Sequence, residues 1–219
     1  MSSSGEQASP EQERIPLSND DPALRRKRQV SGAFGALLFA AAFGGIAGLI
    51  AGRVAGLAAA GVVGAGVFSI VAYNTRRRVW LEGGTLVVRT WGTRRIELAA
   101  AEQLFLLVTD VRSTRTLSLM AGARKGGKTV KIDLALYAGV GGRELGILPL
   151  RKLANALMNN VEANGMIFAE LLVAQLRSEA RGDGIEARPL HRLTAAAPGG
   201  KIAQRYPMEA ISRFVASLD

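Results

Sequence analysis

The sequence predicts a membrane α-helical hairpin followed by a small α+β domain, in which about seven short antiparallel strands are capped by a C-terminal helix. Two uncharged apolar stretches, residues 31–52 and 54–74, lie back to back with Arg53 between them. Short alternating segments separated by turn residues follow, and the spacing becomes helical after Pro149. The composition, 48% hydrophobic and 21% charged, fits a chain that is part membrane protein and part soluble protein.

The two apolar stretches predict a transmembrane hairpin over residues 25–76. Each is about 20 residues long, enough for a helix to cross a hydrocarbon core of ~30 Å. The first is longer than the apolar core of a signal peptide and a second follows at once, so we expect a retained hairpin. Basic residues flank the pair on one side, at Arg25, Arg26, Lys27, Arg28, Arg76, Arg77 and Arg78, and only Arg53 lies at the turn. The positive-inside rule predicts a multi-pass protein of the cell (inner) membrane with both termini in the cytoplasm.

Small residues recur at every fourth position in both stretches: Gly44, Gly48, Gly52, Gly56, Ala60 and Gly64. This spacing lets helix backbones approach closely in lipid. The stripe could join two copies of the chain or pack the two helices of one chain together. The short turn favours packing within one chain.

Charge is distributed unevenly along the chain, whose net charge is +10. Residues 1–24 hold five acidic residues and Arg14 as the single basic one, with few bulky apolar groups, and this predicts a disordered acidic tail. Residues 75–219 hold 22 basic and 13 acidic residues. Such a surface either attracts anionic lipid or is simply solvated. The absence of Cys excludes disulfides, thiolate catalysis and Cys-ligated metals.

Strand periodicity begins directly after the hairpin. Gly83 and Gly84 separate two strand-like runs, a pattern typical of a two-residue β-hairpin. The register then puts Val79, Leu81, Leu86 and Val88 on one core face. Further strands are predicted near residues 94–98, 104–111, 116–120, 128–134 and 143–148. Pro149 is predicted to open a helix whose apolar positions are Leu150, Leu153, Leu157 and Val161.

This order of strands and helix, carried by residues 81–98 and 145–157, resembles the bacterial pleckstrin-homology-like domains attached to two membrane spans. The resemblance covers residues 77–163. It implies a partly open barrel of two packed sheets closed at one end by the helix, and a role in binding or assembly. The loop at Gly83 and Gly84 is too short for the phosphoinositide site of eukaryotic relatives.

The C-terminal part predicts an additional helix in residues 164–184 and a tail in residues 185–219. Within this tail, residues 207–218 form an amphipathic helix with Ile211, Phe214, Val215 and Leu218 on one face. That face could cover the chain's own domain, a partner or the bilayer.

One motif suggests chemistry. Residues 122–129 match the phosphate-binding loop G-x-x-x-x-G-K-[ST] at Gly122, Gly127, Lys128 and Thr129. That mechanism needs a helix to begin at the lysine, so that its N-terminus faces the phosphates. The alternation after Lys128 predicts a strand instead, and hence a polar hairpin tip.

The turn around Trp91 is predicted to lie at the membrane surface. The strand before it must return toward the membrane, and Arg89, Arg94 and Arg95 surround the indole ring. Trp and basic side chains both suit the head-group layer. The alternative is that Trp91 packs against its own domain.

These patterns predict a non-catalytic interaction or assembly module at the membrane. We expect no active site, because the single histidine, His191, lies in a polar tail and the carboxylates have no paired spacing. We expect no cofactor, metal or nucleic acid, and the partners are the bilayer and another membrane or cytoplasmic protein. The alternatives are a nucleotide-binding protein using residues 122–129 and a sensor of anionic lipid.

Overall fold

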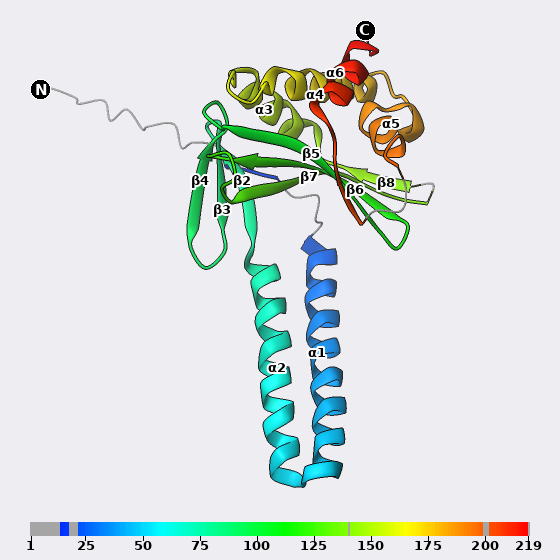
Figure 1. Cartoon of the computed structure of the whole chain (residues 1–219). Helices are drawn as coiled ribbons and strands as arrows, with labels where there is room; N and C mark the ends of the chain where they lie inside the picture. Colours follow the sequence, from blue (N-terminus) through cyan, green and yellow to red (C-terminus); the bar gives the residue numbers. More distant parts are fainter. Residues whose placement is uncertain (1–13, 18–21, 140, 199–201, 219) are drawn as a thin grey trace, which may run out of the picture. The chain divides into compact units, whose positions relative to one another are not determined.

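The structure is a computed structural model that describes residues 14–17, 22–139, 141–198 and 202–218; in the helices, the side chains of residues 22–29, 32, 33, 36 and 71–76 lie outside this description. The described chain forms two compact units. One contains a pair of helices and the turn Arg89–Thr93, and the other contains two antiparallel sheets with the remaining helices. The fold is therefore α+β (Figure 1).

The helical unit consists of α1 (Pro22–Ala51) and α2 (Arg53–Arg76), which pack against each other. The helix pair is longer than the apolar stretches alone, because α1 continues back through the basic cluster at residues 25–28. The break lies at Gly52, whose φ of 86° is accessible to glycine at little cost, and Arg53 is the first residue of α2.

The first sheet has the order β1-β2-β3-β4, formed by Arg14–Pro16, Arg78–Glu82, Thr85–Arg89 and Thr93–Glu97. The predicted hairpin is confirmed: Gly83 and Gly84 turn with φ of 56° and 89°, as a two-residue type I′ loop requires. Leu81, Leu86 and Val88 are buried as predicted, and Val79 is partly buried.

The strand β1 corrects the prediction of a disordered tail over residues 1–24. Ile15 and Leu17 are buried, and the N–H of Leu17 donates to the carbonyl of Val79 at 3.0 Å. The composition of residues 1–24 did not predict this strand, because Ile15 and Leu17 are the only buried apolar side chains among its described residues. Residues 1–13 lie outside the described part.

The second sheet has the order β8-β7-β6-β5-β9 and is antiparallel at every described pairing. Its strands are β5 (Gln103–Val111), β6 (Thr114–Gly122), β7 (Thr129–Ala138), β8 (Gly141–Glu144) and β9 (Ala203–Arg205). Among the described residues the two sheets are separate, so a closed barrel is not formed.

Helices gather over one face of the second sheet (Figure 1). They are α3 (Ile147–Met158), α4 (Gly165–Ala180), α5 (Pro189–Ala195) and α6 (Met208–Ala216), with the 3-10 turn η1 (Ile185–Ala187) before α5. The prediction of a strand through Leu148 was wrong in part, because α3 begins at Ile147 and Pro149 is its third residue. The elements α5, β9 and η1 were not predicted from the sequence.

One core joins both sheets to these helices. Leu150, Leu153 and Leu157 of α3 are fully buried in it, as the helical spacing predicts. The prediction was wrong for Val161, which lies beyond the end of α3 at Met158 and is exposed. The apolar face of α6 packs on the chain's own core, because Ile211 and Val215 are buried there. Asn160 ties the end of α3 to the segment between β4 and β5: its Nδ2 donates to the carbonyls of Leu98 and Ala101, at 2.7 and 2.8 Å.

Candidate membrane-surface site

The outer faces of the helix pair are apolar. Arg53 is the single charged residue among the described side chains of residues 30–70. Leu49 is 90% exposed, and large apolar side chains are exposed along both helices: Phe34, Leu37, Leu38, Phe39, Phe43, Ile46, Ile50, Val54, Leu57, Val62, Phe68 and Ile70. Such a continuous apolar surface requires lipid or protein to cover it.

By length and composition, one described segment, Arg53–Ile70 in α2, is apolar enough to cross a membrane. The corresponding apolar segment of α1, Leu37–Ala51, is shorter than a full span. The second span and the membrane location therefore remain predictions.

The inner faces of the two helices meet at small residues. A Cβ added to Gly56 would lie 2.7 Å from both the carbonyl oxygen of Gly44 and the Cα of Gly48, and one on Gly44 would lie 2.6 Å from the Cβ of Ala60. A Cβ on Gly64 would lie 3.3 Å from the Cβ of Ala40. These helices are therefore as close as glycine allows. Gly52 was predicted to pack one helix against the other. Nothing lies within 4 Å of its Cβ position, and it forms the turn between α1 and α2 instead.

Trp91 is the most exposed aromatic side chain of the described non-helical segments, with 71% of its surface accessible. The N–H of Thr90 donates to the carbonyl of Gly92 at 3.0 Å, which closes the turn that carries Trp91. This turn belongs to the same compact unit as the helix pair. Arg89 at its start and Arg78 in β2 are exposed as well.

The other predicted surface residues are only partly described. Arg94 and Arg95 are exposed on β4, and the guanidinium of Arg95 lies 3.9 Å from the carboxylate of Glu82. Arg77 is partly buried and has a further interaction of its own. The side chains of Arg25, Arg26, Lys27, Arg28 and Arg76 lie outside the described part.

The predicted nucleotide loop is a hairpin tip between β6 and β7. The strand expected after Lys128 is confirmed, since β7 begins at Thr129. Loop amides that would cradle phosphate are already used: Gly127 N–H donates to the carbonyl of Arg124, and Lys125 N–H to the carboxylate of Glu102. The geometry that this motif needs is not formed here.

A buried polar cluster that was not predicted from the sequence joins β7, β8, α4 and Arg188, the residue before α5. The carboxylate of Glu144, 8% exposed, accepts hydrogen bonds from Tyr137 at 2.7 Å, Gln175 at 2.9 Å and Arg188 at 2.5 Å. The hydrogen bond to Glu144 raises the pKa of Arg188. Burial, and then the same carboxylate, raise the pKa of Tyr137 far above its usual value. Both carboxylate oxygens of Glu144 already accept hydrogen bonds from the chain itself. We therefore interpret this cluster as a structural link between β7, β8 and α4.

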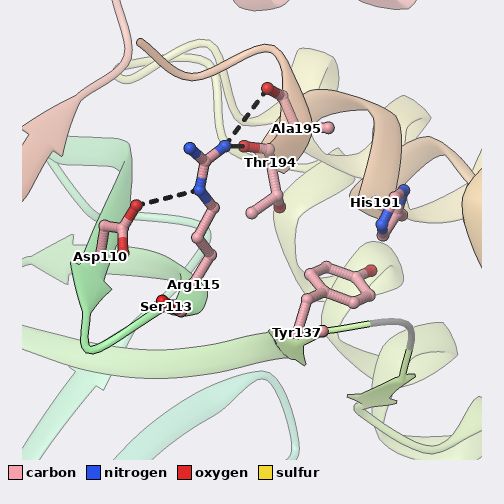
Figure 2. Close-up of a pocket in the computed structure, with 8 residues that line it drawn as sticks. Asp110, Ser113, Arg115, Tyr137, His191, Thr194 and Ala195 are labelled. Carbon is pink, nitrogen blue, oxygen red and sulfur yellow. Dashed lines mark hydrogen bonds and ion pairs between the residues drawn. The ribbon is translucent and has the colours of Figure 1, made fainter. Parts of the chain in front are cut away.

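A cavity of about 430 Å³ lies between the end of the β5–β6 hairpin and α5 (Figure 2). Arg115 crosses it: Nε lies 3.0 Å from Asp110, and the guanidinium also donates to the carbonyls of Thr194 and Ala195. These carbonyls end α5, where a cation is favoured. The charge of Arg115 is thus matched by groups of the chain itself.

His191 lines the same cavity, against the prediction that it lies in a polar tail. It belongs to α5, and its ring meets Tyr137 edge-on with centroids 4.8 Å apart. The described residues hold no carboxylate hydrogen-bonded to this imidazole and no group of acids, histidines or cysteines arranged for a metal. Among the residues that the structure describes, no hydroxyl is hydrogen-bonded to this imidazole.

Comparison of the chain with protein-family models, with curated proteins and with solved structures finds no match.

Proposed function

We propose that this is a membrane-anchored, non-catalytic protein whose soluble unit acts as an interaction or assembly module at the cytoplasmic face of the cell membrane. The apolar outer surface of the helix pair carries this proposal. Its exposed side chains run from Phe34 to Ile70 with Arg53 as the one described charge. Water would solvate such a surface poorly, and a hydrocarbon layer would cover it.

The sheet arrangement supports the proposal of a pleckstrin-homology-like domain. Two antiparallel sheets are followed by α3, which buries three leucines in the shared core. The departures are the flanking strands β1 and β9 and the helices after α3. The interaction role rests on this likeness and on the hydrogen bonds that occupy both carboxylate oxygens of the buried Glu144. The nucleotide-binding alternative is disfavoured by the strand at Thr129.

The membrane topology provides the test. We expect reporter fusions after residue 30 and after residue 219 to report the cytoplasm together, because seven of the eight basic residues near the helix pair lie on that side. The protein should also resist alkaline extraction from membranes. A periplasmic reporter active at either end would contradict the topology, and release by alkaline extraction would contradict the anchor.

Recognition of anionic lipid is a second candidate, favoured by Trp91 and the arginines near it. An exposed indole ring next to Arg89, in the compact unit that contains the helix pair, suits the head-group layer. In this reading the turn holds the soluble unit at the membrane surface, and each basic residue near anionic lipid contributes about 1 kcal/mol.

Fluorescence of Trp91 tests the lipid contact. The chain has two tryptophans, and Trp80→Phe leaves Trp91 alone; the indole Nε1 of Trp80 has no hydrogen-bond partner among the described residues, so the change is mild. In proteoliposomes with anionic lipid, we expect brominated acyl chains to quench Trp91, and neutral lipid to weaken the effect. Trp91→Phe in the wild-type background is the matched control. Unquenched Trp91 in anionic membranes would contradict the contact.

A further inference from the structure

The strand β1 is separated in the sequence from the rest of its sheet by the helix pair. It consists of three residues, Arg14–Pro16, at one edge of the first sheet, and it pairs with β2 alone. The register sets Arg14 opposite Glu82, Ile15 opposite Leu81 and Pro16 opposite Trp80. Along the chain, β1 precedes the helix pair and β2 follows it. The edge of β2 is thus a docking site for a strand, occupied in this structure by the chain's own N-terminal segment.

The edge of β2 has a defined chemistry. Ile15 and Leu17 are 5% and 4% exposed, so an occupant inserts two apolar side chains two residues apart. Arg14 Nε lies 3.0 Å from Glu82 Oε1, which favours a cation just before the first apolar residue. Residues 14–17 of any copy of this chain supply both apolar side chains, Ile15 and Leu17, and the cation, Arg14.

Pro16 limits this edge to one added strand. Leu17 N–H donates to Val79, so the pair Leu17–Val79 is hydrogen-bonded, and by alternation so is Ile15–Leu81. Pro16 then occupies a non-hydrogen-bonded position, with its nitrogen directed away from β2. Because proline has no N–H to offer there, a further strand would find an incomplete edge. The first sheet therefore ends at the strand that occupies this edge.

Few interactions hold β1 in place. The strand contributes two buried side chains and an ion pair whose Arg14 partner is mostly exposed, and exposed pairs are weak. The conformational entropy lost by ordering four residues opposes this gain and is of similar size. Membrane anchoring confines copies of the chain to one plane and raises their effective concentration.

We propose that the edge of β2 also accepts residues 14–17 of a second copy, so that two chains exchange β1 strands and form a symmetric dimer. This inference rests on the proposed assembly function and names its partner as the protein itself.

Disulfide trapping in this cysteine-free chain tests the exchange. Arg14 and Glu82 form a non-hydrogen-bonded pair, in which Cα atoms lie about 4.5 Å apart and a disulfide fits. Full-length Arg14→Cys and Glu82→Cys chains, carrying different tags, are reconstituted together in liposomes and oxidised. We expect a disulfide-linked heterodimer. Adding Ile15→Asp and Leu17→Asp to the Arg14→Cys chain should abolish it.

Two controls make the result decisive. Arg14→Cys mixed with Glu97→Cys, which lies exposed on β4 away from β1, reports random collision and should give no heterodimer above background. The single chain carrying both Arg14→Cys and Glu82→Cys must form a disulfide, which proves that the strand pairs. If that double variant forms only an internal disulfide and the mixed chains give no heterodimer, the exchange is wrong. Flotation of the same liposomes reports membrane anchoring separately.

Discussion

Buried polar side chains of the unit that contains the two sheets link segments that are distant in the sequence. Glu144 accepts hydrogen bonds from Tyr137 in β7, from Gln175 in α4 and from Arg188, the residue before α5. Burial keeps the Tyr137 hydroxyl protonated by raising its pKa, so the folded protein retains a proton that the unfolded chain releases near pH 10. A pH dependence of stability follows from this difference.

We predict that stability falls as pH rises above about 10 and that Tyr137→Phe makes this fall shallower. A folded-state pKa raised above the unfolded value gives stability that is present below pH 10 and is lost above it. One such tyrosine contributes about 2 kcal/mol of loss between pH 9 and 11.5. Urea denaturation of the detergent-solubilised chain across this range measures the slope. Tyr206, whose pKa burial also raises, gives the parallel variant Tyr206→Phe. An unchanged slope in Tyr137→Phe would show that its hydroxyl titrates freely.

At the scale of elements, the helix pair depends on close backbone approach. Gly56 faces Gly44 and Gly48 at distances that leave no room for a side chain, whereas Gly61 has nothing within 4 Å of its Cβ position. These two glycines lie in the same helix and differ only in the face they occupy. In lipid, such small-residue contacts are a main source of helix association.

We predict that Gly56→Leu separates α1 from α2 and that Gly61→Leu does not. In the cysteine-free chain, Ala40→Cys with Gly64→Cys reports the contact, because the Cβ positions lie 3.3 Å apart, close to the ~3.8 Å of a disulfide. Oxidation in membranes should give a high yield of internal disulfide. Gly56→Leu should lower this yield strongly, and Gly61→Leu should leave it unchanged. Equal yields in both variants would rule out the glycine contact as the determinant of pairing.

At the scale of the whole molecule, the unit that contains the two sheets is assembled from segments that precede and follow the helix pair in the sequence. Leu17, which precedes the pair, is buried in the same core as Leu81, which follows it. Since β1 and β2 are hydrogen-bonded neighbours, residues 14–17 and 78–82 must lie on the same side of any membrane that the helices enter. This requirement agrees with the distribution of basic residues.

We predict that the soluble unit needs β1 for full stability even without the helices. A chain joining residues 1–17 to residues 77–219 by a Gly/Ser linker should exceed its Ile15→Asp, Leu17→Asp variant by about 1–2 kcal/mol in free energy of unfolding, because the burial of two side chains contributes about 1.5–3 kcal/mol each and the entropy lost by ordering residues 14–17 offsets most of this gain. Urea denaturation measures the difference. Arg14→Ala in the same linked chain removes only an exposed ion pair and should change stability by less than about 1 kcal/mol. Equal stability of the linked chain and its Asp variant would mean that β1 adds nothing to the core.

Much of the fold could be read from local pattern. The Gly83–Gly84 turn, the alternation after Lys128 and the apolar spacing of α3 are each decided by neighbours within a few residues, and the structure has each of them. The pattern of small residues in the helices could be read in the same way. Of the candidate site, the sequence predicted a surface turn at Trp91, and the exposure of this side chain agrees with it, whereas its contact with lipid stays a prediction.

The remaining features depend on contacts between distant residues, which local pattern does not contain. Two apolar side chains in an acidic tail do not predict β1. The strand forms because it pairs with the edge of β2 and buries Ile15 and Leu17. Glu144 and Arg188 are 44 residues apart, and only the packing of α5 on the sheet brings them together. The sequence by itself determined the apolar helices, the turns and the strand periods, since these follow from side-chain spacing. The tertiary structure alone decided the partners of the edges and of the buried charges, since burial makes an unpaired polar group costly and so selects its partner.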